Sequence, residues 1–296
     1  MWEQITRNKV KSTLLVAFFV AFVIFLGWIF GQYTQLGPAG PVLAGIIAGV
    51  SAFVSYYNSD KIVLAMSHAR PATKQEFPYL YNTVEGLAIS AGLPTPRLYV
   101  IDDTAPNAFA TGRNPEHAAI AVTTGLLQKL NRAELEGVIG HEMSHIGDYD
   151  MLLMTLTVVM VGTVALLSDW MLRSFLWGGG RRRRDSGGGQ AGMVLMLVGL
   201  VLAILAPIIA QLIRLAISRR REFLADANSA RLTRYPEGLA SALEKISIDR
   251  EPLEVANKAT AHLYIANPLR DIGGAVNSLF STHPPVEKRI AALRAM

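Results

Sequence analysis

The sequence predicts a membrane α-helical protein that carries an α+β domain on the cytoplasmic side of the bilayer. Three observations support this fold class. Of the 296 residues, 51% are hydrophobic and only 17% are charged, whereas soluble domains contain roughly 25% charged residues. The apolar residues are concentrated in a few long uncharged runs. The polar remainder contains signals for both strands and helices, and because it contains no cysteine, any metal must be held by His and carboxylate ligands.

The first uncharged run, from Ser12 to Ser59, suits two membrane-spanning helices. A Gly- and Pro-rich turn divides the run, and a span needs about 20 apolar residues, so spans are predicted at 12–33 and 38–57. The alternative is a cleaved signal peptide followed by a core helix. We prefer two spans, because the run is too long for a signal peptide and lacks a small-residue cleavage site.

Two later apolar segments, 151–177 and 190–213, are predicted to form a second pair of spans, which makes four in all. A buried hairpin in a soluble domain is the alternative for this pair. The stretch between them, 178–189, consists of Gly, Arg, Asp and Ser and is typical of a flexible linker. The predicted organisation is therefore a membrane hairpin at 1–59, the first part of a polar domain at 60–150, the second apolar pair at 151–217 and the second part of the polar domain at 218–296.

Basic residues beside the spans predict the orientation. Arg7, Lys9 and Lys11 precede the first span and three arginines follow the fourth, and such residues favour the cytoplasmic face. The arginines of the linker then lie on the opposite face, against this rule. Either the first helices dominate the topology or the second pair does not fully cross, and we prefer four crossings. Because topology explains the net charge of +5, we expect a lipid bilayer partner and no nucleic acid.

The polar segments predict a small α+β domain. One helix is expected over 79–91, and another begins at Asn131, where Glu134 completes a capping box. Three short β-rich runs, bounded by turn residues, are expected to form a meander at 97–101, 105–112 and 118–123.

The second of these helices carries the run His141-Glu142-Met143-Ser144-His145. Histidines four residues apart project from one helix face about 6 Å apart, so both can bind a single Zn²⁺. Glu142 lies beside such an ion without binding it and is the predicted general base for an attacking water. The alternative is a pair of structural histidines, although chance gives this pattern in roughly one such chain in two hundred.

A catalytic zinc needs a third protein ligand and an open position. Glu222 follows the fourth predicted span and is the candidate, with Asp226 one turn later to accept the free ring N–H of a ligand histidine. The alternative is that Glu222 only pairs with the neighbouring arginines. An even number of crossings between His145 and Glu222 returns the chain to the same membrane face, so all three ligands can meet there. One Zn²⁺ per chain is therefore expected.

These features together resemble the HtpX-type membrane metallopeptidases of the gluzincin family, which also includes the CAAX prenyl endopeptidases. The resemblance covers nearly the whole chain and includes the runs Asn107-Ala-Phe-Ala-Thr-Gly-Arg113 and Thr282-His-Pro-Pro-Val-Glu-Lys-Arg-Ile290. It implies a gluzincin-like zinc endopeptidase of the bacterial inner membrane, with polypeptide substrates and a site that faces the cytoplasm. It also implies degradation of damaged or misassembled membrane proteins under stress.

The two runs contribute further candidate residues. Asn107, Ala108 and Phe109 fit an exposed edge strand that binds an extended substrate by β-augmentation; for Asn107, the alternative is a turn asparagine. The resemblance implies that His283 donates to the oxyanion of the tetrahedral intermediate and that Arg289 supports it. The alternative for His283 is an ordinary loop histidine.

Two rival functions remain at this point. A CAAX-processing peptidase is expected to enclose a chamber with more spans than the four counted here. A catalytically silent, zinc-stabilised adaptor or chaperone would not need Glu142, and a structural site normally fills its fourth position. We therefore prefer an endopeptidase. Its substrates, its cleavage specificity and its oligomeric state are not predicted.

Overall fold

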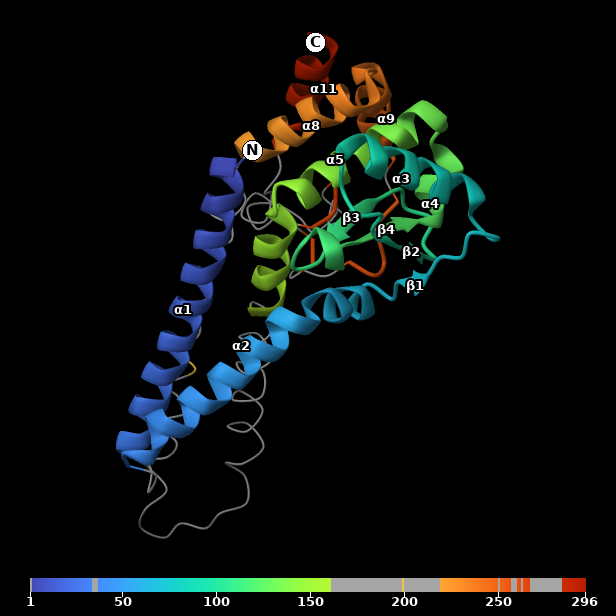
Figure 1. The fold of residues 1–296 in the computed structure, drawn as a ribbon. Coiled ribbons are helices and arrows are strands. Elements are labelled where there is room, and N and C mark those ends of the chain that lie inside the picture. Colours follow the sequence, from blue (N-terminus) through green and yellow to red (C-terminus); the bar gives the residue numbers. More distant parts are fainter. Residues whose placement is uncertain are drawn as a thin grey trace.

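The structure is a computed structural model that describes residues 2–33, 37–160, 199, 219–249, 251–256, 260–261, 263–266 and 284–296. Two long helices form a hairpin that extends away from an α+β body (Figure 1). The labelled elements are α1 (Trp2–Tyr33), α2 (Ala39–Met66), β1 (Arg70–Pro71), α3 (Pro78–Ala91), β2 (Arg97–Ile101), β3 (Ala108–Thr111), η1 (Pro115–His117), β4 (Ala119–Thr123), α4 (Thr124–Lys129), α5 (Arg132–Gly147), α8 (Arg219–Thr233), α9 (Pro236–Ile248) and α11 (Val286–Arg294). A further apolar helix spans Asp150–Met160.

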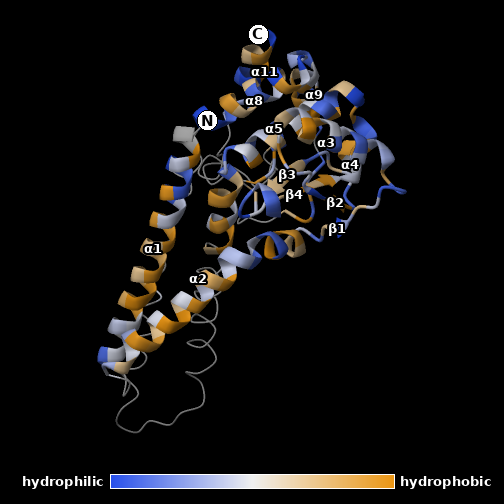
Figure 2. Cartoon of the chain, in the orientation of Figure 1, coloured by the Kyte–Doolittle hydropathy of each residue, from blue (hydrophilic) through white to orange (hydrophobic). Residues whose placement is uncertain are grey.

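The hairpin of α1 and α2 has the features of a membrane pair. Its candidate spans are Ile5–Trp28 and Ala39–Met66. The two helices approach closely near their connection, where a Cβ added to Gly40 would lie 2.8 Å from the Cα of Gly31, and small residues allow such packing between membrane helices. Their outer surfaces are apolar (Figure 2), and Phe53, for example, is 64% exposed. Exposed apolar surface on this scale suits contact with lipid.

Both helices extend beyond the predicted spans, because α1 begins at Trp2 and α2 continues to Met66. Within the described residues, two helices are long and apolar enough to cross a membrane, where the sequence predicts four. Of the predicted spans 151–177 and 190–213, only residues 151–160 and 199 are described, and residues 151–160 are buried against the protein. The remainder of this pair and the linker at 178–189 lie outside the described residues.

The sheet has the order β1-β2-β4-β3. β2 and β4 are parallel, with Leu98 opposite Ile120, whereas β3 pairs antiparallel with β4, with Phe109 opposite Ala121. The strands β2, β3 and β4 lie within the three predicted runs, whereas the short strand β1 was not predicted. The predicted meander is wrong. β3 does not pair with β2; it forms a hairpin with β4 through η1, and β4 lies between the two strands.

Both faces of the sheet are covered, which explains why every residue of β4 is buried. Side chains alternate along a strand, so Ile120 and Val122 face one core while Ala119 and Ala121 face another. The first core contains buried residues of α3, α5 and α9, and the second contains residues of α2, of the helix Asp150–Met160 and of the segment Leu263–Tyr264. Helix α5 is therefore held between the sheet and the helices α8 and α9 (Figure 1).

Candidate metal centre

Helix α5 presents the two histidines of the predicted motif. The capping box at its start is confirmed, because the Asn131 side chain accepts from the Glu134 N–H at 3.0 Å and Glu134 accepts from the Asn131 N–H at 2.8 Å. His141 and His145 lie one turn apart on the buried part of the helix. Their Nε2 atoms are 3.1 Å apart, so both rings point to the same spot.

Helix α8 brings Glu222 to this spot. Its Oε2 lies 3.8 Å from His141 Nε2 and its Oε1 lies 3.6 Å from His145 Nε2. The close approach of α8 to α5 uses Gly140, where an added Cβ would lie 2.9 Å from the Oγ of Ser229. Ser229 also donates to the carbonyl of Gly137 at 2.7 Å. The predicted convergence of these distant segments is therefore present in the structure.

The geometry of these three residues fits a tetrahedral divalent cation. Ligands at about 2.0–2.1 Å from a zinc ion lie about 3.3 Å from one another, and the separations of 3.1, 3.6 and 3.8 Å bracket this value. His141, His145 and Glu222 also form a group whose ligand atoms all lie within 4.8 Å of one another. All three residues are buried.

The outer ring nitrogens of both histidines face carboxylates. His141 Nδ1 lies 2.9 Å from Asp226 Oδ1, and His145 Nδ1 lies 3.2 Å from Asp150 Oδ2. A carboxylate at Nδ1 holds the proton there and leaves Nε2 with a lone pair. When neither Nε2 carries a proton, the two atoms that face each other are both acceptors, and a cation between them would satisfy both.

Arg289 of α11 closes the back of the site. It is fully buried and binds Asp226 through two hydrogen bonds, from Nε to Oδ2 at 2.9 Å and from Nη2 to Oδ1 at 2.7 Å. Its Nη1 lies 3.6 Å from Glu222 Oε2. Its planar donors thus fix Asp226, which in turn orients His141.

The charge balance of the cluster also favours a cation. Four carboxylates, those of Glu142, Asp150, Glu222 and Asp226, are buried here beside the guanidinium groups of Arg221 and Arg289. Burial lowers the pKa of His141 to about 4, although Asp226 opposes this shift. Burial also disfavours charge on His145, but Asp150 and Glu222 outweigh it and raise the pKa to about 9. The surrounding carboxylates thus favour a positive charge at His145, which a divalent cation between the ligands would supply in place of the proton.

Glu142 lies between the two ligand histidines in sequence and is 2% exposed. Burial raises its pKa to about 7, while His145 and a hydrogen bond from the backbone of Ala110 oppose the rise. The bond to Ala110 places the carboxylate against β3. A carboxyl group whose pKa is near 7 can both accept and release a proton at neutral pH.

The free edge of β3 is not open as the sequence predicts. Ala108 accepts a hydrogen bond from the N–H of Ile265 at 3.0 Å, and the Asn107 amide donates to the carbonyl of Ala266 at 3.1 Å. Phe109 is fully buried and packs edge-on against Tyr264, with ring centroids 5.1 Å apart. The expected exposure of this edge is therefore wrong, because the chain's own segment Leu263–Ala266 covers it.

The chain resembles known proteins over its full length. Residues 74–296 match Peptidase family M48. The chain belongs to this family. It is 51% identical over 296 residues to a Protease HtpX homolog of Dictyoglomus thermophilum, covering 100% of this chain and 94% of that protein. It is 45% identical to the Protease HtpX homolog of Ligilactobacillus salivarius, with both chains covered over their full length.

The fold of this M48 chain is similar to the crystal structure of S. mikatae Ste24p. The TM-score is 0.53 at 19% sequence identity, and the match covers 99% of this chain and 67% of that chain. Membership of the M48 family makes this chain a metallopeptidase, and the HtpX homologues together with the apolar hairpin indicate a membrane protein.

His283 lies outside the described residues, so its predicted role stays a prediction. Conversely, the structure adds residues that the sequence did not indicate: Asp150, Arg221 and Asn8. Asp150 is five residues after His145, a spacing that does not place two side chains on one helix face. Helix α5 ends at Gly147, and Tyr149 adopts a positive φ of 60°, which turns the chain so that Asp150 points back at His145.

Proposed function

We propose that this M48 metallopeptidase is a zinc endopeptidase of the cytoplasmic membrane that cleaves misfolded or damaged membrane proteins. The observation that carries the proposal is the buried group of His141, His145 and Glu222 with Glu142 beside it. This group lies in a body that continues directly from an apolar helical hairpin (Figure 2). This arrangement supports access to substrates in or at the membrane.

Three protein ligands with an open position are typical of catalytic zinc. His141 and His145 would supply their Nε2 atoms and Glu222 a carboxylate oxygen. When bound, the metal would lower the pKa of a water and polarise the scissile carbonyl. Glu142 would accept the proton of the attacking water and then donate it to the nitrogen of the leaving amine.

The edge of β3 is the proposed binding site for the substrate backbone. A peptide laid along β3 would bind Asn107 and Ala108, which now contact Ile265 and Ala266. The carbonyl of Ile265 accepts from Arg289 Nη1 at 3.1 Å, so the covering segment also reaches the side chains that surround the metal ligands. A substrate strand therefore takes the position of Leu263–Ala266 as it binds. His283 remains the predicted oxyanion donor.

The proposed orientation places the site on the cytoplasmic side. The support is the set of basic residues at the body-proximal end of α1, Arg7, Lys9 and Lys11, because positive residues favour that side. Proteins that become damaged in the membrane, or misassembled during stress, would then be cleaved from the cytoplasm.

A reconstituted system tests this function. The full chain would be placed in lipid vesicles with a membrane protein that carries a destabilising substitution, and with its folded parent as a control. We expect zinc-dependent cleavage of the destabilised protein and slower cleavage of the parent. Glu142→Gln should lower the rate by about 10²- to 10⁴-fold while zinc stays bound.

The same assay separates the alternatives. An adaptor or chaperone would protect or retain the destabilised protein equally well with Glu142→Gln. A CAAX-type peptidase would cleave a prenylated C-terminal peptide and leave the destabilised protein intact. Either result would overturn the proposed function.

A further inference from the structure

The two ligand histidines of α5 are oriented by different carboxylates. Asp226, one turn after Glu222, binds His141 Nδ1, whereas Asp150 binds His145 Nδ1. Asp150 belongs to neither of the two sequence motifs that carry the ligands. We propose that Asp150 is the positioning residue for His145, and that Asn8 of α1 and Arg221 of α8 hold it in place. This inference rests on the proposed zinc site.

Both oxygens of Asp150 are used. Oδ2 faces His145 Nδ1 at 3.2 Å, and Oδ1 accepts from Arg221 Nη1 at 2.5 Å and from Asn8 Nδ2 at 2.7 Å. The Asp150 side chain is 4% exposed and the Arg221 side chain is 7% exposed. With partners on both sides and little water, the carboxylate is restricted to one rotation, which fixes the acceptor that His145 faces.

Arg221 supplies the charge that makes this carboxylate stable. A buried carboxylate without a cation is costly, and the buried guanidinium of Arg221 lies directly against Oδ1 of Asp150. Arg221 directly precedes the ligand Glu222 on α8. Asp150 therefore ties the helix that carries one ligand to the end of the helix that carries the other two.

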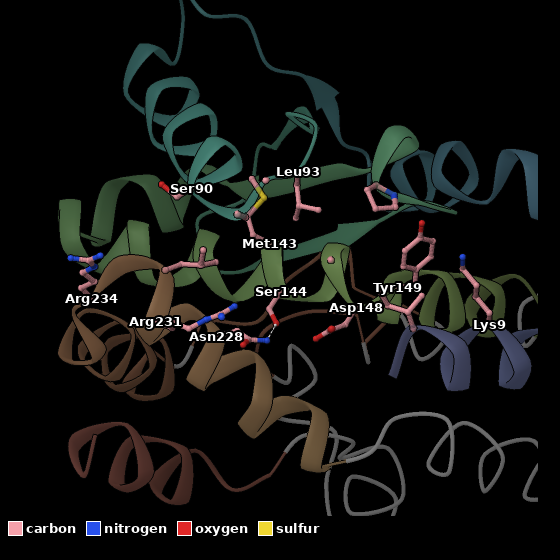
Figure 3. Close-up of a pocket in the computed structure, with 16 residues that line it drawn as sticks. Lys9, Ser90, Leu93, Met143, Ser144, Asp148, Tyr149, Asn228, Arg231 and Arg234 are labelled. Atoms are coloured by element: carbon pink, nitrogen blue, oxygen red, sulfur yellow. Dashed lines mark hydrogen bonds between the residues drawn. The ribbon is translucent and has the colours of Figure 1, made fainter. Parts of the chain in front are cut away.

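Asn8 connects this network to the first membrane helix. Its side-chain amide donates to the carbonyl of Asp148 at 2.9 Å as well as to Asp150. The next residue, Lys9, places its Nζ 4.4 Å from the centre of the Tyr149 ring. Figure 3 shows Lys9, Tyr149 and Asp148 along this contact. The turn from Asp148 to Asp150 is thus held by α1, and the position of α1 bears on the orientation of His145.

Asp148 provides a matched control. It is a buried aspartate on the same turn, but it lines a cavity of about 850 Å³ that is also lined by Ser144, Asn228 and Arg231 (Figure 3). None of the three metal ligands lines this cavity. Replacing either aspartate by asparagine changes an acid to an amide on the same turn. Only the change at Asp150 affects a side chain that contacts His145.

The test measures metal binding in full-length protein purified in detergent. Asp150→Asn keeps the shape of the side chain but replaces one carboxylate oxygen by an NH₂ group. That group must face a hydrogen-bond donor, either His145 on one side or Arg221 and Asn8 on the other. We expect zinc affinity, measured by competition with a chromophoric chelator, to fall about 10- to 100-fold. We also expect the visible spectrum of the Co²⁺-substituted protein to change. Asp148→Asn should leave both the affinity and the spectrum as in the wild type.

Asn8→Ala gives a second, milder variant in case Asp150→Asn does not fold. It removes one of the bonds to Asp150 and should weaken zinc binding several-fold with an altered Co²⁺ spectrum. Wild-type zinc affinity and an unchanged spectrum in Asp150→Asn, or in Asn8→Ala if only that variant folds, would overturn the positioning role. If the wild-type chain itself binds no zinc, the proposed function fails instead, so the two failures are distinguishable.

Discussion

Arg289 shows how much a single buried side chain does at the residue scale. It holds Asp226 through two hydrogen bonds and lies near Glu222. Arg289→Ala leaves the buried Asp226 beside His141 without its guanidinium partner, and breaking a buried ion pair costs about 3–5 kcal/mol. We therefore expect a fall of that size in the free energy of unfolding, measured by chemical denaturation in detergent.

Arg289→Lys tests the geometry separately from the charge. Lysine restores a positive charge but not the planar pair of donors, so we expect only partial recovery of stability. An exposed arginine is the control: Arg294→Ala removes surface pairs with Glu237 and Glu244, each of which contributes little to stability. Equal stability losses for Arg289→Ala and Arg294→Ala would contradict the role of Arg289.

At the scale of elements, the start of α5 is stabilised by charge. Burial raises the pKa of Glu134, but hydrogen bonds from Lys245, the Asn131 backbone and Ser241 lower it more, so the pKa lies below its usual value. A carboxyl whose folded pKa is lowered stabilises the fold above the unfolded pKa of about 4.3. That contribution to stability is lost as the pH falls through the pKa of Glu134 in the folded protein.

Glu134→Gln should therefore destabilise the protein by about 0.5–2 kcal/mol at pH 7, and the difference from wild type should shrink below about pH 4. Thermal unfolding across this pH range gives the measurement. Glu136→Gln on the same helix is the control, because its partner Arg132 is 79% exposed and such a surface pair contributes little. A stability loss for Glu134→Gln that does not change with pH would argue against the charge effect.

The segment Leu263–Ala266 is expected to leave the edge of β3 when a peptide binds there. If substrates bind along β3, an active-site peptide hydroxamate must displace the Ile265 N–H from the Ala108 carbonyl. We expect faster hydrogen exchange at Ile265 and Ala266 when the hydroxamate is bound, with the β4 amides that pair with β2 unchanged. Undiminished protection of Ile265 in the inhibited protein would rule out this edge as the substrate site.

The elements also show which inferences the sequence supports. Local signals predicted α3, the capping box at Asn131 and the strands β2 and β4, because each depends on neighbours within a few residues. The order of the strands was predicted wrongly as a meander, since the parallel pairing of β2 with β4 is set by packing on both faces. Similarly, Asn8 and Asp150 meet across 142 residues, and no local pattern indicates that contact.

The whole molecule joins an apolar hairpin to a metal-binding body, and its orientation can be tested directly. The chain has no cysteine, so single cysteines can be introduced without background. Ser90→Cys lies on α3 of the body, and Gln32→Cys lies near the far end of α1; both residues are exposed. In intact cells, a membrane-impermeant maleimide should label the cysteine at 32 but label the one at 90 only after lysis. The reverse pattern would place the site outside the cytoplasm.

The convergence of α5 and α8 on one metal is the claim on which the rest of the account depends, and metal analysis of the purified full chain tests it most directly. We predict one zinc ion per wild-type chain and its loss in Glu222→Ala. Glu237→Ala, a change at an exposed glutamate of α9, should retain the ion. Wild-type zinc content in Glu222→Ala would contradict the account.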